Sequence, residues 1–115
     1  MPKVLVTGAG GFLGTTLVNE LCKRGIMVRA VLREVTQAAL LPPMAEMVWS
    51  DIRDARTIKE AASGCDAVVH LAGKVHAIDA PGLEQDYHAI NVEGTKCVLD
   101  AAIAAGVKHV VFASS

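Results

Sequence analysis

Residues 4–14 read Val-Leu-Val-Thr-Gly-Ala-Gly-Gly-Phe-Leu-Gly, and this stretch decides the fold. A short apolar run enters a turn with glycines at Gly8, Gly11 and Gly14, and a helical pattern follows at once. Gly8 lets the chain turn sharply off a strand, and Gly14 lets the helix pack closely on that strand. Gly11 lets the backbone come close to a pyrophosphate, which would face free amides and the positive end of the helix. The stretch therefore predicts the opening strand–turn–helix unit of a dinucleotide-binding domain.

A glycine triplet alone is a weak signal, but here a strand precedes it and a helix follows it. The chain has no Gly-Lys-Ser/Thr after the glycines, which excludes a P-loop. At 115 residues we expect one domain, spanning residues 1–115. A hydrophobic content of 52% with 3% aromatic residues predicts a core of Val, Ile, Leu and Ala, typical of helices packed on a parallel sheet.

The charge and the apolar runs narrow the class of partner. The net charge of −1 and the scattered Lys and Arg argue against nucleic-acid binding. No apolar run approaches the roughly 20 residues of a membrane span, and the N-terminus lacks a signal-peptide layout. Cys22, Cys65 and Cys97 are odd in number, far apart and in apolar contexts. We expect buried thiols in a reducing, cytoplasmic compartment, without a disulfide or a metal site.

Strand and helix patterns alternate along the chain. Strands are expected at Val4–Thr7, Met27–Leu32, Met47–Trp49, Ala67–His70 and His109–Ala113. Helices are expected over Phe12–Arg24, Ala55–Ser63 (capped by Asp54) and about 83–105, with a short helical turn over Val35–Leu41. This alternation predicts an α/β fold, a doubly wound parallel sheet (Rossmann fold) with strand order 3-2-1-4-5. The ligand crevice is then expected at the carboxyl ends of the strands, above the first and fourth.

Four segments resemble the motifs of one family. Thr7–Gly14 matches the TGxxGxxG signature of the extended short-chain dehydrogenases/reductases, and His70–Gly73 resembles the segment after their fourth strand. Tyr87–Thr95 resembles the family's YxxxNVxGT helix, and Val110–Ser115 resembles the strand end that leads to its catalytic Ser/Thr. In these motifs, the chain is most similar to NAD(P)-dependent epimerases and dehydratases of nucleotide sugars.

The resemblance implies a set of cofactor-binding residues. In the first turn they are Gly8, Gly11, Phe12, Leu13 and Gly14. Asp51 would accept a hydrogen bond from the adenine amino group, and Ile52 would pack on the ring; the alternative for Asp51 is an ordinary surface turn. The small or apolar Leu71, Ala72 and Gly73 suit a backbone that approaches the nicotinamide ribose. His70 and Asn91 are expected to have structural roles, and Lys74-Val75-His76 either contact substrate or lie in solvent.

The end of the second strand bears on the choice of cofactor. NAD-selective domains usually place an acid there, roughly 20 residues past the glycines, to bind the ribose diol. Here Arg33 could pair with a 2′-phosphate, although Glu34 beside it could serve a ribose instead. A solvated charge pair is the third reading. We expect NADP to be preferred over NAD.

The family's chemistry requires a Tyr and a Lys four residues apart, beyond the fifth strand. The single tyrosine, Tyr87, has Asn91 at that spacing and belongs to the preceding helix. Ser115 matches the catalytic Ser/Thr by position, and the sequence given stops there. The resemblance therefore implies the amino-terminal portion of a longer enzyme, without its substrate-binding part.

We expect this portion to bind dinucleotide, to be inactive by itself and to self-associate through apolar surface that the truncated sheet exposes. The substrate of the parent enzyme would be a nucleotide sugar. The alternative is a non-catalytic NAD(P)-binding module with a regulatory or redox-sensing role. An unrelated flavin- or nucleotide-binding Rossmann protein is disfavoured by the motif over residues 91–95.

Overall fold

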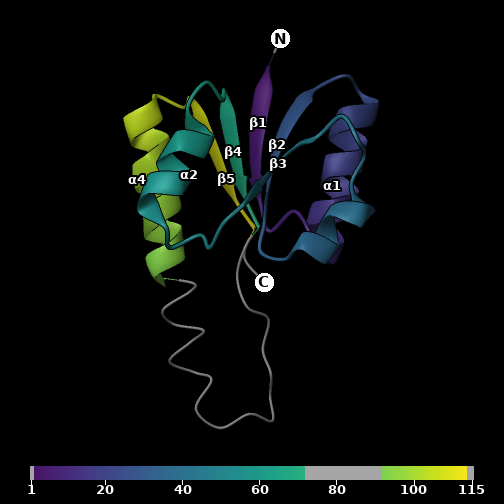
Figure 1. The fold of residues 1–115 in the computed structure, drawn as a ribbon. Helices are drawn as coiled ribbons and strands as arrows, with labels where there is room; N and C mark the ends of the chain where they lie inside the picture. The colour runs from purple at the N-terminus through teal and green to yellow at the C-terminus, as the bar shows by residue number, and fades with distance from the viewer. Residues whose placement is uncertain (1, 72–91, 114–115) are drawn as a thin grey trace, which may run out of the picture.

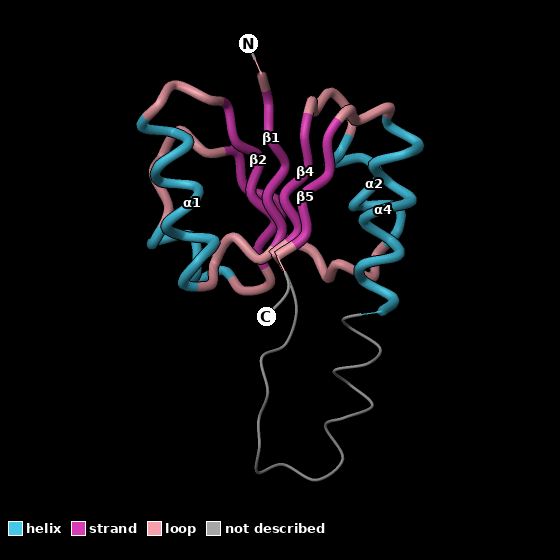
Figure 2. Tube along the Cα trace, turned by 180° about the vertical axis from the view of Figure 1, so that it is seen from behind, coloured by secondary structure: helices cyan, strands magenta, loops and turns pink. Residues whose placement is uncertain are grey.

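The computed structural model describes residues 2–71 and 92–113. Five parallel strands form one sheet in the order β3-β2-β1-β4-β5, as the sequence predicts. Helix α1 covers one face, and α2 and α4 cover the other (Figures 1 and 2). The strands are β1 (Lys3–Thr7), β2 (Met27–Leu32), β3 (Glu46–Trp49), β4 (Ala67–His70) and β5 (His109–Phe112). The helices are α1 (Phe12–Lys23), the 3₁₀ segment η1 (Val35–Leu40), α2 (Ala55–Ala62) and α4 (Gly94–Ala105).

The observed elements begin and end close to the predicted residues. β3 starts one residue earlier than expected because Glu46 pairs in register with Arg29 of β2. The side chain of Asp54 caps α2 by accepting a hydrogen bond from Thr57 N at 3.2 Å, as predicted. Of the long helix expected over about 83–105, residues 83–91 lie outside the described part, and α4 accounts for residues 94–105. It ends at Gly106, whose φ of 71° is the left-handed conformation that favours glycine.

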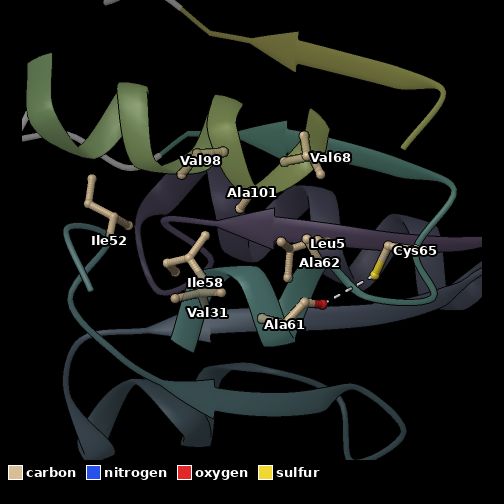
Figure 3. Close-up of a cluster of buried hydrophobic side chains, with 11 residues drawn as sticks. Leu5, Val31, Ile52, Ile58, Ala61, Ala62, Cys65, Val68, Val98 and Ala101 are labelled. Atoms are coloured by element: carbon tan, nitrogen blue, oxygen red, sulfur yellow. Dashed lines mark hydrogen bonds between the residues drawn. The ribbon is translucent and has the colours of Figure 1, made fainter. Parts of the chain in front are cut away.

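The side chains of β1 alternate between two apolar clusters, one on each face of the sheet. Leu5 points to the α2–α4 side and Val6 to the α1 side, and both are fully buried. Figure 3 shows the first cluster, in which Ile58 and Ala61 of α2 pack with Val98 of α4 over the sheet. The core is aliphatic, as the composition predicts.

The five strands are parallel, so all of them begin at one end of the sheet and finish at the other, and these two ends present different groups. We call the side where strands begin the amino edge and the side where they end the carboxyl edge. On the amino edge, Glu46 Oε1 lies 2.9 Å from Lys3 Nζ and Glu46 Oε2 lies 2.9 Å from Arg29 Nε. These hydrogen bonds, the one from Lys3 first, lower the pKa of Glu46 below its usual value. Arg29 Nη1 also donates to Ser63 O at 2.9 Å, which ties the sheet to the end of α2.

The thiols are only partly as expected. Cys22 and Cys65 are buried, whereas Cys97 is half-buried, and burial raises the pKa of each. Within residues 2–71 and 92–113, no helix is long and apolar enough to cross a membrane. Large apolar side chains are exposed on α4 (Leu99 and Ile103) and on β5 (Val111 and Phe112). This surface agrees with the basis of the self-association prediction, which itself stays untested.

Candidate functional site: the carboxyl edge of the sheet

The turn between β1 and α1 is built on Gly8 and Gly14. Gly8 has a φ of 67°, so it makes the sharp turn in a conformation that side chains rarely adopt. A Cβ on Gly14 would overlap the Gly8 carbonyl oxygen and come within 2.8 Å of the Ala9 Cα. Gly14 therefore packs against the turn itself rather than against the strand, which refines the role expected from the sequence.

Gly11 differs from Gly8 and Gly14 because the fold leaves space beside it. Its φ of −78° and ψ of 174° are open to any residue, and it is exposed. A Cβ there would meet only the Gly8 carbonyl oxygen, at 3.5 Å, an ordinary contact. Gly11 is the N-cap of α1, where no side chain caps the helix and no acidic residue stands in the first turn. Neither the N-cap nor the first turn of α1 therefore places a carboxylate at the positive end of the helix.

Phe12 and Leu13 open the helix on the outside of the turn. Phe12 is 92% exposed and Leu13 57% exposed, so neither side chain contributes to the core. What these positions offer to a ligand is backbone at the start of a helix and an open apolar surface.

The end of β2 places Arg33 at the carboxyl edge. Arg33 is exposed and forms none of the ion pairs found within residues 2–71 and 92–113. Gln37, which was not among the residues expected from the sequence, holds the backbone here. Its Oε1 accepts hydrogen bonds from Arg33 N and Glu34 N, each at 3.2 Å. A Cβ on Gly10 would collide with the Gln37 amide, so this side chain lies directly against the glycine turn. The signal that could have found Gln37 is its spacing, because a glutamine three residues after the residue that opens a helical segment is the pattern of a capping box.

Asp51 follows β3 and is exposed, as a ligand-binding carboxylate would be. Arg53 holds it with three hydrogen bonds: its backbone N and Nε donate to Oδ1 at 2.8 and 3.2 Å, and Nη2 donates to Oδ2 at 2.9 Å. These bonds are the main cause that lowers the pKa of Asp51, and the positive charge of Arg33 adds to the effect. The carboxylate is therefore ionised and oriented at neutral pH.

Ile52 does not lie as expected from the sequence. Its side chain is 3% exposed and belongs to the core cluster that Figure 3 shows, where a Cβ on Gly94 of α4 would collide with it. The expected packing of this side chain on an adenine ring is therefore not supported. The side chain anchors the turn after β3 to α4, and only the backbone of Ile52 remains for a ligand.

His70 ends β4 and joins four elements. Its Nδ1 lies 2.6 Å from Thr7 Oγ1, its Nε2 lies 3.2 Å from Thr95 Oγ1, and its ring meets that of Phe112 edge-on at 5.7 Å. The imidazole is 4% exposed, and burial lowers its pKa. This agrees with the expected structural role, although the partners are hydroxyls rather than backbone.

Leu71 follows His70 and marks the end of the described segment. It is half-buried, and its backbone N donates to Thr7 Oγ1 at 3.2 Å. The remaining predicted positions, Ala72, Gly73 and Ser115, lie outside the described residues, as do Tyr87, Asn91 and residues 74–76.

The described residues thus assemble the glycine turn, Arg33 and Asp51 at one edge of a five-stranded parallel sheet, the placement that dinucleotides require. A model of the NAD dependent epimerase/dehydratase family matches residues 4–115. The chain belongs to this family.

Proteins similar in sequence match the chain over nearly its whole length. The sterol demethylase protein B of Methylococcus capsulatus is 41% identical over 96% of the chain. The chain covers 34% of that protein, about a third of its length. Other curated relatives, at 32–38% identity, are hydroxysteroid dehydrogenases and reductases.

The similar solved structures include several with bound ligands. A short-chain dehydrogenase/reductase superfamily protein from Agrobacterium tumefaciens with bound NAD is 38% identical, with a TM-score of 0.83 over 98% of this chain and 32% of that one. The UDP-glucose 4-epimerase of Stenotrophomonas maltophila, with NAD and formylated UDP-arabinopyranose, is 27% identical. Its TM-score is 0.88 over 100% of this chain and 37% of that one. The family is thus NAD-dependent, and its members act on more than one class of substrate.

Proposed function

We propose that the chain binds a nicotinamide dinucleotide along the carboxyl edge of the sheet, with the pyrophosphate at the start of α1. The observation that carries the proposal is the open space beside Gly11. Backbone conformation and packing account for Gly8 and Gly14, but neither requires a glycine at position 11. A phosphate that must reach the backbone does require one, because a side chain would stand between them.

The other predicted residues fit the same ligand. Phe12 and Leu13 supply the exposed first turn of α1, and Asp51 supplies an oriented acceptor for the adenine amino group. Arg33 is an exposed cation at the end of β2, where the adenosine ribose lies in such domains. Leu71, with the undescribed Ala72 and Gly73, would face the nicotinamide ribose.

The binding proposal is tested by calorimetric titration of the protein with NAD⁺ and NADP⁺. Gly11→Val places two methyl groups where the pyrophosphate would lie, so we expect dissociation constants to rise at least about tenfold, the equivalent of one strong hydrogen bond. The matched control is Ile103→Val, on the outer surface of α4. An unchanged dissociation constant in Gly11→Val would refute the site.

We further propose that NADP⁺ binds more tightly than NAD⁺, because Arg33 can form charge-assisted hydrogen bonds with a 2′-phosphate. Arg33→Ala should bring the two dissociation constants together by weakening NADP⁺ alone. Equal affinities in the wild-type protein, or a preference that survives the substitution, would reject this role for Arg33. A preference for NAD⁺ that depends on Glu34 would assign the ribose to that carboxylate.

For the whole protein, we propose oxidoreduction at a hydroxyl or carbonyl carbon, with the bound cofactor supplying hydride chemistry. A nucleotide sugar, the substrate expected from the sequence, is supported by the ligand of the Stenotrophomonas epimerase. Hydroxysteroids are the second candidate, because curated relatives include hydroxysteroid dehydrogenases. Analysis of the products formed from each substrate class would decide between them, because oxidation of a hydroxysteroid leaves reduced cofactor, whereas an epimerase or dehydratase returns the hydride to its sugar and leaves none.

A further inference from the structure

The turn after β3 brings a second charged residue to the adenine end of the proposed site. Arg53 stands two residues after Asp51 and gives it three hydrogen bonds, from both its backbone and its guanidinium. Asp54, the next residue, is engaged elsewhere because it caps α2. Arg53 therefore contacts the Asp51 carboxylate closely enough to fix its direction.

Three hydrogen bonds and one buried side chain hold the backbone around Asp51 and Arg53. The carbonyl of Asp51 accepts hydrogen bonds from Ser50 Oγ at 2.8 Å and from Asp54 N at 3.0 Å. The carbonyl of Arg53 accepts one from Cys97 Sγ of α4 at 3.5 Å. Between them, the Ile52 side chain is buried in the core. With the backbone fixed, the rotation of the Asp51 side chain is the freedom that remains, and Arg53 restricts it.

The carboxylate keeps the capacity to bind one more donor. An ionised carboxylate has two oxygens and about four acceptor positions. Arg53 places two hydrogen bonds on Oδ1 and one on Oδ2, so Oδ2 can still accept an N–H. An ionised carboxylate offers no proton, so it attracts an amino group and repels a carbonyl oxygen.

We propose that Arg53 is a positioning residue that orients the Asp51 carboxylate toward the 6-amino group of adenine and so makes the site select adenine over a 6-oxopurine. The inference rests on the proposed dinucleotide site and adds to it a residue that need not touch the ligand. An exposed ion pair without this role would contribute little to either stability or recognition.

The test compares NAD⁺ with nicotinamide hypoxanthine dinucleotide, in which a carbonyl oxygen replaces the amino group. Both dissociation constants are measured by calorimetry for the wild-type protein, Asp51→Ala, Arg53→Ala and Arg53→Lys. Arg56→Ala is the matched control, because it removes a nearby exposed arginine that pairs with Glu60 rather than with Asp51. Circular dichroism of each variant establishes that it is folded.

We expect the wild-type protein and Arg56→Ala to prefer NAD⁺ about tenfold, the scale of one hydrogen bond to a charged group. Asp51→Ala should abolish the preference, Arg53→Ala should reduce it to less than about threefold, and Arg53→Lys should restore part of it. A full preference in folded Arg53→Ala would overturn this inference and leave the dinucleotide site standing. Failure of the wild-type protein to bind either dinucleotide would overturn the proposed function and this inference together.

Discussion

At the amino edge of the sheet, Glu46 pairs with both Lys3 and Arg29, whereas at the carboxyl edge Arg33 takes part in no ion pair of the described residues. The carboxyl edge also has a helix that begins without a capping side chain and an N-cap glycine that the fold does not require. Charges that satisfy one another stabilise a fold, and those left open remain available to a ligand. The carboxyl edge has an ion pair of its own, between Asp51 and Arg53, so what distinguishes it is the open start of α1 and an Arg33 that no ion pair of the described residues engages.

The largest loss of stability is expected at the carboxyl edge, from substitution of Gly14, where packing leaves no room for a side chain. Gly14→Val would force its side chain into the Gly8 carbonyl and the Ala9 backbone, so we expect the free energy of unfolding to fall by about 3 kcal/mol. Gly11→Ala, three residues away, should cost less than about 1 kcal/mol, because its Cβ has room. Chemical denaturation of both variants measures the difference, and equal losses would contradict the separate roles of the two glycines.

The next effect is a pH dependence that originates at the carboxyl edge. The pKa of His70 is lowered in the folded protein. As the pH falls below about 6.5, this histidine therefore takes up its proton in the unfolded chain before it does so in the folded one. Stability should therefore be complete above that pH and decline as the pH falls toward the folded-state pKa, by up to about 1.4 kcal/mol per pH unit. His70→Gln should lower stability at pH 7.5, because the contacts of the imidazole with the hydroxyls of Thr7 and Thr95 are lost, and should flatten the slope. An identical slope in the variant would show that another group causes it.

A smaller effect, in a lower pH window, is expected from the amino edge. Glu46→Gln removes the carboxylate shared by Lys3 and Arg29, and we expect a loss of about 1 kcal/mol at neutral pH because the group is partly exposed. The pKa of Glu46 is lowered, so this contribution is present above pH 4.5 and disappears as the pH falls through the folded-state pKa. Glu60→Gln, in an exposed helix pair, is the control and should change little. A loss that persists at pH 3 would exclude the ionic explanation.

The sequence predicts the strands, their order and the glycine turn because each depends on local signals. Alternating strand and helix patterns leave few topologies, and the residue spacing of Gly8, Gly11 and Gly14 specifies the turn. The sequence does not predict the direction of Ile52, since this residue stands in a turn where no period determines which way a side chain points. Its burial depends on Gly94, forty-two positions away in the chain, which leaves the space that it fills.

Two site residues escaped prediction for a related reason. Gln37 and Arg53 act by holding Arg33 and Asp51 through contacts only two to four residues away in the chain, and a local pattern of this kind does not show which side chain will make the contact. A weak sequence signal did exist for Arg53, because an arginine two residues after an acid can reach back across a tight turn. The hydroxyl of Thr95 belongs to the YxxxNVxGT motif, but its contact with His70 forms only after α4 packs on the sheet.

The most direct test of the account is an amide map of dinucleotide binding by NMR. With saturating NAD⁺, we predict the largest chemical-shift changes at Gly8–Gly14, at Arg33 and at Asp51–Arg53. The amides of Lys3, Arg29 and Glu46 on the opposite edge should stay nearly unchanged. The claim that the dinucleotide binds at the carboxyl edge would be contradicted by saturable binding whose chemical-shift changes concentrate on the amino edge. It would equally be contradicted by saturable binding that leaves the amide shift of Gly11 unchanged.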